Sequence, residues 1–161
     1  MLDRQRNGAT NPGYVGIDIG TTPSMPTPAV ETTWCLSGRT RRPALVRRGD
    51  LIALWITGKK DPGIYEFGYV TSDGVAEEPM VPESALHVEF QAIRLDPDSY
   101  VPRAVMAASP TLRDCEQFRA PIVANPSYLT RPQAVVLAGL IASRAPRESM
   151  EISGWATALT W

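Results

Sequence analysis

The sequence predicts an α+β fold, because three segments have the pattern of β-strands and one carries the signals of a helix. Two of the strands, Leu51–Ile56 and Ile64–Val70, are short apolar runs separated by a turn rich in Gly, Lys, Asp and Pro. The third, Leu86–Leu95, alternates apolar with polar residues, as is typical of a strand with one buried face. The helix is expected over Thr130–Arg144.

The first two strands are predicted to form an antiparallel hairpin at the centre of the sheet. Flanking glycines and the content of Tyr, Phe and Val favour strands over a buried helix. Both runs are too apolar for a sheet edge, where unpaired backbone groups face water. We therefore expect the two strands to be neighbours, with Leu54 and Phe67 largely buried.

The helix is marked at both ends. Thr130 is the expected N-cap and fits a capping box with Gln133, while Pro132 suits the first turn. Arg144 falls in the last turn, where positive charge is favourable at the carbonyl end of a helix. Pro146 then stops the helix.

Weaker signals predict the remaining elements. Tyr14–Ile19 is expected to form one short strand, and Val105–Ala108 and Leu112–Phe118 are expected to be short helical pieces. Glu148–Trp161 is expected to be a tail or a final strand, and its two tryptophans indicate that it packs against the body of the protein.

The composition is that of one globular domain. The chain has 161 residues, of which 43% are hydrophobic and 20% are charged, enough to bury a core. Residues 1–10 are predicted to be a disordered N-terminus, followed by a single domain over residues 11–161. No apolar run reaches membrane-spanning length and the N-terminus has no hydrophobic signal region, so we expect a cytoplasmic protein without a membrane partner.

Positive charge is concentrated in one part of a chain whose formal net charge is −1. Between Gly38 and Lys60, Asp50 is the only acidic residue and seven residues are basic: Arg39, Arg41, Arg42, Arg47, Arg48, Lys59 and Lys60. Such a segment is compatible with contacts to a few phosphate groups. A solvated, arginine-rich loop without a ligand explains the same pattern equally well.

The segment from Trp34 to Val70 resembles EVE domains, which belong with YTH and ASCH domains to the PUA-like group of small β-barrels. A tryptophan-led loop, WCLSGRTRR, leads to a GD turn; an apolar strand then ends in WITG, and PGIYEFGYV follows after a short turn. Downstream, NPSYLT at residues 125–130 resembles the closing segment of these domains. The similarity covers residues 11 to about 144.

The resemblance implies a fold and a site. The fold would be a PUA-like small β-barrel of five or six strands with short flanking helices. A pocket in the barrel wall of EVE and YTH domains holds a modified base, which needs stacking surfaces, edge contacts and nearby cations. Carried over to this chain, the pocket residues are Trp34, Ser37, Arg39, Trp55, Thr57, Tyr65 and Asn125. Together with the charge pattern, the resemblance implies phosphate contacts at Arg41, Arg42, Lys59 and Lys60.

Two of the pocket residues have an ordinary structural role that stays open. Trp55 lies on an apolar strand, where packing in the core explains it equally well. Asn125 precedes Pro126 and can be only a turn-former. Trp34 precedes a polar loop, which favours a position lining a cleft.

The sequence contains no motif of an enzyme or a metal site. There is no GxSxG, HExxH or Walker loop, and no carboxylate–cysteine set with metal spacing surrounds His87, the single histidine. Cys35 and Cys115 form neither a CxxC motif nor a disulfide framework. We therefore expect no catalytic residue, no cofactor and no metal.

The leading hypothesis is a non-catalytic module that binds DNA or RNA carrying a modified base. Bacterial relatives of such domains are linked to restriction or to RNA modification, so a nuclease or restriction component is an expected partner. One alternative is the same fold binding a small molecule or a protein without base recognition. Another is a nucleic-acid-processing enzyme related to ASCH proteins, which is disfavoured because the only lysines, Lys59 and Lys60, lie in the hairpin turn.

Overall fold

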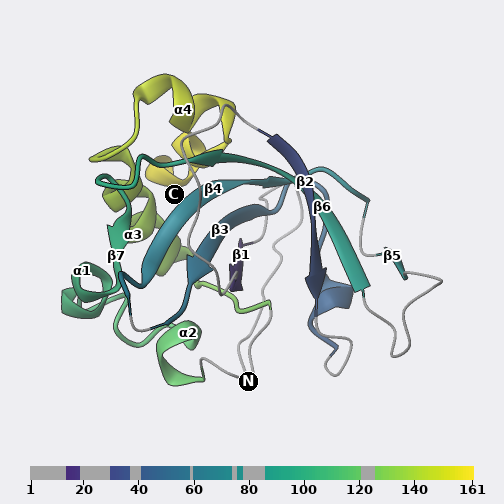
Figure 1. Cartoon of the computed structure of the whole chain (residues 1–161), viewed down its shortest axis with the longest axis horizontal. Helices are drawn as coiled ribbons and strands as arrows, with labels where there is room; N and C mark the ends of the chain where they lie inside the picture. The colour runs from purple at the N-terminus through teal and green to yellow at the C-terminus, as the bar shows by residue number, and fades with distance from the viewer. Residues whose placement is uncertain are drawn as a thin grey trace.

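A curved β-sheet forms the framework of the protein. The computed structural model describes residues 14–18, 30–36, 41–58, 60–73, 76–77, 86–120 and 126–161. Its strands are β1 (Tyr14–Asp18), β2 (Val30–Leu36), β3 (Leu51–Ile56), β4 (Gly63–Val70), β5 (Ala76–Glu77), β6 (Leu86–Arg94) and β7 (Val101–Pro102). Figure 1 shows the α-helices gathered on one side of this sheet, with β2 on the other.

The main path of the sheet runs β1-β3-β4-β6-β2. β1 is parallel to β3, and the other neighbours on this path are antiparallel. The α+β class holds, but the predicted closed barrel is wrong, because the terminal strands β1 and β2 do not pair with each other in the described sheet. Closure needs a hydrogen-bonded ladder between those two strands, which a pattern of apolar residues does not specify.

The predicted central hairpin is confirmed. β3 and β4 are adjacent antiparallel strands with neighbours on both sides, and Leu54 and Phe67 are buried. The turn between them uses a left-handed backbone at Gly58 and Asp61, two residue types that tolerate it. The strand predicted at Leu86–Leu95 is β6, and Tyr14–Asp18 forms the short strand expected near the N-terminus. β2 was not predicted.

Apolar side chains pack on both faces of the sheet. Successive side chains of a strand point to opposite faces, so β3 contributes to two separate cores. The helix-side cluster contains Leu51, Ala53 and Trp55 of β3, together with residues of β4 and the helices. The β2-side cluster contains the alternate β3 residues with residues of β2, β4 and β6, and is formed by Leu36, Val46, Ile52, Leu54, Val70, Val88, Phe90 and Ala92.

The β4–β6 pairing depends on a close backbone approach at Gly68. Gly68 lies opposite Ala92, and a Cβ added to it would be 1.8 Å from the carbonyl oxygen of Gln91. Only a residue without a side chain fits such an approach.

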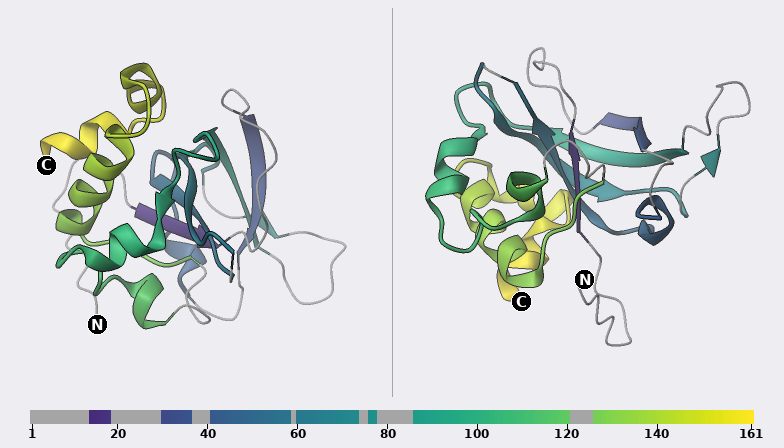
Figure 2. Two further views of the ribbon diagram at one scale, coloured as in Figure 1. Left: turned by 60° about the vertical axis from the view of Figure 1, so that its left-hand side comes forward. Right: turned by 90° about the horizontal axis from the view of Figure 1, so that it is seen from below.

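The helices other than η1 cover one face of the sheet (Figures 1 and 2), while η1 directly precedes Val46 of the β2-side cluster. The bounds of the helices are η1 (Pro43–Leu45), α1 (Arg103–Ala108), α2 (Glu116–Arg119), α3 (Arg131–Ala142), α4 (Arg147–Ile152) and η2 (Trp155–Thr160). The best-marked helix is confirmed as α3: Gln133 Oε1 accepts a hydrogen bond from the Thr130 N–H at 2.9 Å, as a capping box requires. Among the described residues, no helix is both long and apolar enough to cross a membrane.

The C-terminal segment folds as helices α4 and η2, so the alternatives of a tail or a final strand were wrong. The prediction that it packs is confirmed by Trp155, which is fully buried. Its indole Nε1 donates to the carbonyl oxygens of Ile52 and Gly68, both at 3.0 Å. One side chain therefore fastens the C-terminal helices to the central strands β3 and β4.

Candidate functional site

Trp34 lies near the end of β2, where it pairs with Val88 of β6. Its side chain is half-buried and packs against the β2-side cluster. The indole Nε1 is buried and has no hydrogen-bond partner in the described part of the chain. A buried donor without a partner is costly, so packing alone does not explain why a tryptophan stands here.

Tyr128 is a second aromatic residue at the same cluster. It is half-buried and packs against the β2-side cluster, as Trp34 does. Its hydroxyl donates to the carbonyl oxygen of Arg42 at 2.6 Å, and its backbone N–H donates to Glu116 Oε2 at 3.0 Å. Both ends of the residue are therefore fixed by hydrogen bonds.

Arg42, which was predicted to contact phosphate, forms an ion pair with Glu116. Its Nη1 donates to Glu116 Oε2 at 2.6 Å, and its Nη2 donates to the other carboxylate oxygen. The guanidinium carbon also lies 5.9 Å from the centre of the Tyr128 ring. A guanidinium whose two terminal nitrogens both donate to a carboxylate is poorly placed to make a bidentate contact with phosphate.

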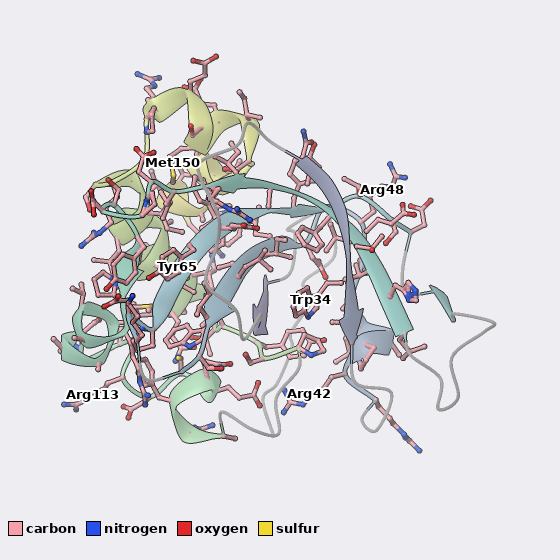
Figure 3. All side chains as sticks on the ribbon, in the orientation of Figure 1. Trp34, Arg42, Arg48, Tyr65, Arg113 and Met150 are labelled. Carbon is pink, nitrogen blue, oxygen red and sulfur yellow. The ribbon has the colours of Figure 1, made fainter. Side chains whose placement is uncertain are left out.

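These contacts join segments that are far apart in the sequence. Arg42 and Tyr128 are separated by 86 positions, and Arg42 Nη1 also reaches the Pro126 carbonyl oxygen at 3.4 Å. Figure 3 shows Trp34 and Arg42 toward the β2 side of the molecule and Tyr65 toward the helices. The structure thus brings together two of the regions on which the resemblance rests, the Trp34–Arg42 region and the 126–130 segment.

The Arg42–Glu116 pair stays ionised at neutral pH. Burial raises the pKa of the Glu116 carboxyl, whereas hydrogen bonds from Arg42 and from the Tyr128 amide lower it. The lowering effects outweigh burial, so the pKa of Glu116 is below its ordinary value. The pKa of Arg42 is raised, mainly by its hydrogen bond to Glu116. Each partner therefore favours the charged form of the other.

Trp55 lies on the opposite face of the sheet from Trp34. It is buried in the helix-side cluster, where its ring meets Phe118 edge to face with centroids 5.4 Å apart. The core role that stayed open for Trp55 is the one observed. The two tryptophans do not share a pocket.

A cavity lies between β3 and the helices on the Trp55 side. It is a small cavity of about 30 Å³, lined by Ala53, Trp55, Ile64, Met106, Leu112, Cys115, Gln117, Ser127, Leu129 and Leu137. Ser127 Oγ donates to Gln117 Oε1 at 2.8 Å. Gln117 Nε2 is buried and has no partner within the described chain.

Tyr65 is not available to stack on a base. Its ring is buried and stacked on Tyr100, with centroids 4.5 Å apart and planes inclined by 9°. Its hydroxyl donates to the carbonyl oxygen of Asp61 at 2.8 Å. The pKa of Tyr65 is raised to about 12, mainly by burial and to a smaller extent by the neighbouring Tyr100 and Asp61. Tyr65 therefore acts as part of the packing around the hairpin turn.

The remaining predicted residues are scattered. Arg41 and Lys60 are exposed, and Thr57 is half-buried just after β3. Figure 3 shows Arg42 and Arg48 far apart, and Arg48 pairs with Asp73 at 2.8 Å, so the basic segment does not form one face. The other predicted residues lie outside the described residues: Ser37, Arg39, Lys59 and Asn125.

Three residues at these sites carried no signal in the sequence analysis. Glu116 and Gln117 lie on the short helix α2, and their partners are 74 and 10 positions away. Tyr128 was noted only as part of the NPSYLT segment. A glutamate in a helical stretch is usually exposed, so its sequence does not reveal a buried ion pair until the guanidinium partner is known.

The described side chains offer no metal site, because no group of three or more His, Cys, Asp or Glu residues among them could hold an ion. Cys115 is a buried thiol at the wall of the cavity, and burial raises its pKa. A thiol of raised pKa is a poor nucleophile at neutral pH.

Comparisons with known proteins show a fold and no family. No protein-family model matches the chain, and no curated protein matches it by sequence. It is similar to the structure of a hypothetical protein from Leishmania major, with a TM-score of 0.59 and 9% identity over 84% of this chain and 98% of that one. It is also similar to Rpa0253 from Rhodopseudomonas palustris, with a TM-score of 0.60 and 14% identity over 83% of this chain and 96% of that one. At such low identity these similarities show the fold alone.

Proposed function

We propose that this protein is a non-catalytic nucleic-acid-binding module that recognises a modified base in DNA or RNA. The observation that carries the proposal is that Trp34 and Tyr128 both pack against the β2-side cluster, and that Tyr128 is bound to Arg42. They come from the two regions in which the sequence resembles EVE domains. The site is on one face of an open, curved sheet, and not in the wall of a closed barrel.

The chemistry of base recognition suits this site. A base out of its helix needs a flat aromatic partner, and stacking contributes about 1–3 kcal/mol per base. Trp34 is half-buried, so part of its ring is available, and its unpartnered Nε1 adds a hydrogen-bond donor. Ser37, Arg39 and Asn125 are close in sequence to this site and stay in the proposal; Trp55 and Tyr65 do not.

The test is a binding screen of the purified protein. The probes are short single- and double-stranded DNA and RNA oligonucleotides with methylated, hydroxymethylated or unmodified bases at one position. Trp34→Ala is the test variant, and Trp161→Ala is its matched control, because Trp161 is a half-buried tryptophan that packs against the helix-side cluster. We expect Trp34→Ala to reduce the affinity for the preferred modified oligonucleotide about tenfold or more, with a smaller loss for its unmodified parent.

The outcomes separate clearly. Unchanged binding by folded Trp34→Ala would place the base elsewhere on the protein. Equal losses in both tryptophan variants would indicate a general effect on stability, which thermal melting of each variant measures. If no oligonucleotide binds the unmodified protein, the proposed function is wrong.

The cavity on the helix side supports a second candidate, a module that binds a small molecule. Its wall is largely apolar, and Gln117 presents a buried amide with one end bound to Ser127 and Nε2 unpartnered. The chemistry of that wall suits a small aromatic amide, which has an apolar ring and a carbonyl acceptor, but the cavity of about 30 Å³ must widen to admit one. Chemical-shift changes confined to cavity residues on addition of benzamide, together with no binding of oligonucleotides, would favour this candidate.

A further inference from the structure

Arg42, Glu116 and Tyr128 form a closed network, which we call the Arg42 clasp. The Arg42 guanidinium holds the Glu116 carboxylate, that carboxylate accepts the Tyr128 backbone N–H, and the Tyr128 hydroxyl returns to the Arg42 carbonyl oxygen. Every link joins different segments of the chain: the stretch before η1, helix α2, and the 126–130 segment. The clasp therefore fixes three loop-like regions relative to one another.

Burial makes the clasp a stable arrangement. The Glu116 side chain is only 9% exposed and that of Arg42 30%. A carboxylate buried to this extent needs its partner, since removal of one member of a buried pair leaves an uncompensated charge. The planar Arg42 guanidinium donates to both carboxylate oxygens of Glu116, a geometry that the single ammonium group of a lysine cannot reproduce.

Tyr128 is the residue whose position the clasp determines. Its ring is held by a hydrogen bond at the hydroxyl, by another at its own backbone N–H and by the guanidinium above its face. It packs against the same cluster as Trp34. A ring fixed before binding loses little conformational freedom when a base stacks on it, which strengthens binding.

We infer that the Arg42 clasp positions Tyr128 as the second aromatic surface of the base site, on the same cluster as Trp34, and that Arg42 acts through Tyr128 instead of contacting phosphate. This inference rests on the proposed function of the site. Tyr128 is then a base-contacting residue, and Arg42 and Glu116 are positioning residues.

Two conservative substitutions distinguish positioning from phosphate contact. Arg42→Lys keeps a positive charge for a phosphate but loses the two-pronged grip on Glu116. Glu116→Gln loses the ion pair and releases the Arg42 guanidinium. If Arg42 contacted phosphate, the first variant would keep its affinity and the second would gain affinity; if it positions Tyr128, both lose affinity.

The experiment measures binding of the tightest oligonucleotide in the modified-base panel, at several salt concentrations and well below each variant's melting temperature. We expect Arg42→Lys and Glu116→Gln each to weaken binding about tenfold, with the salt dependence unchanged. Tyr128→Ala should weaken it at least as much, and adding Arg42→Lys to Tyr128→Ala should cause no further loss. Arg41→Ala is the control, because Arg41 is the exposed neighbour outside the clasp; it should lower the slope of binding against salt by about one.

Tyr128→Phe is a milder variant that tests the same inference if the other variants fail to fold. It removes only the hydroxyl that bonds to the Arg42 carbonyl oxygen, and we expect about a fivefold loss of affinity.

Each failure has its own pattern. If Trp34→Ala weakens binding but the clasp variants and Tyr128→Ala bind normally, the inference is wrong and the proposed function stands. If Arg42→Lys binds normally while Arg42→Ala lowers the salt slope by about one, Arg42 is a phosphate contact. If no oligonucleotide binds the unmodified protein, the proposed function and this inference fall together.

Discussion

Gly68 shows how a single atom decides how closely two neighbouring strands can approach. An alanine Cβ at this position would meet the backbone of β6, 1.8 Å from the Gln91 oxygen and 2.7 Å from Ala92 Cα. Backbone atoms cannot move aside as the end of a flexible side chain can, so β4 and β6 would have to separate. The two strands lie at the centre of the sheet, and their separation would affect both clusters.

We predict opposite effects for two glycine substitutions. Gly68→Ala should destabilise the protein by about 3 kcal/mol or more and lower its thermal midpoint by roughly 10 °C. Gly139→Ala is the matched control: Gly139 lies inside α3 with nothing within 4 Å of an added Cβ. It should stabilise the protein by about 0.5–1 kcal/mol, because alanine is the better helix former. Thermal melting of both variants tests the pair, and similar midpoints would contradict the close approach.

At the scale of elements, the C-terminal helices depend on Trp155. The Nε1 of Trp155, the first residue of η2, donates to one carbonyl oxygen of β3 and one of β4. Its ring is buried in the helix-side cluster. Trp155→Phe would leave a cavity and remove both hydrogen bonds. We expect a loss of about 2–4 kcal/mol in the free energy of unfolding, measured with urea. Trp161→Phe, at a half-buried position, should cost less than about 1 kcal/mol; equal losses would contradict the anchoring role.

Glu116 joins helix α2 to Arg42 and to the 126–130 segment through contacts that depend on its charge. The pKa of Glu116 is lower in the folded protein than its ordinary value of 4.5, so ionised Glu116 stabilises the fold. That stabilisation is complete above the ordinary pKa and is lost as the pH falls through the lower, folded-state pKa. We predict that the stability difference between the unmodified protein and Glu116→Gln is constant above about pH 5.5 and shrinks below about pH 4.5. Urea midpoints of both proteins from pH 3 to pH 7 measure it; a difference that grows toward acid would mean that the folded pKa is raised.

At the scale of the whole molecule, charge is dispersed. Arg42 pairs with Glu116, Arg48 pairs with Asp73, and Arg47 donates to the backbone of Ala44 and Val46. Of the described basic residues between 41 and 60, Arg41 and Lys60 are exposed and make no ion pair. The described part of this segment therefore offers a nucleic acid few cations without an acidic partner.

We predict a shallow salt dependence for any nucleic acid that binds. Two phosphate contacts give a slope of about −1.4 to −1.8 in a plot of log affinity against log salt, against about −4.9 to −6.3 if all seven basic residues took part. Arg41→Ala and Lys60→Ala should each lower the slope by about one. Arg147→Ala is the control, because Arg147 pairs with Glu151 on α4, outside the candidate site. A steep slope that neither variant changes would place the phosphate contacts elsewhere.

Local patterns in the sequence determined the elements. The hairpin β3–β4, the strand β6 and the capped helix α3 each follow from residues near one another in the chain, because turn chemistry, alternation and capping act over a few positions. In the C-terminal segment the tryptophans correctly predicted burial, but the predicted tail or strand is a pair of helices in the structure. Burial of a large side chain is compatible with either a strand or a helix.

The tertiary structure alone decided the form of the sheet and the composition of the site. The end strands β1 and β2 remain unpaired with each other in the described sheet, and β3 divides its side chains between two cores, which separates Trp34 from Trp55. The Arg42 clasp joins residues up to 86 positions apart, so no local pattern could reveal that this arginine already has a partner. An exposed arginine and a paired one have the same sequence signature, since what distinguishes them is a carboxylate that only folding brings within reach.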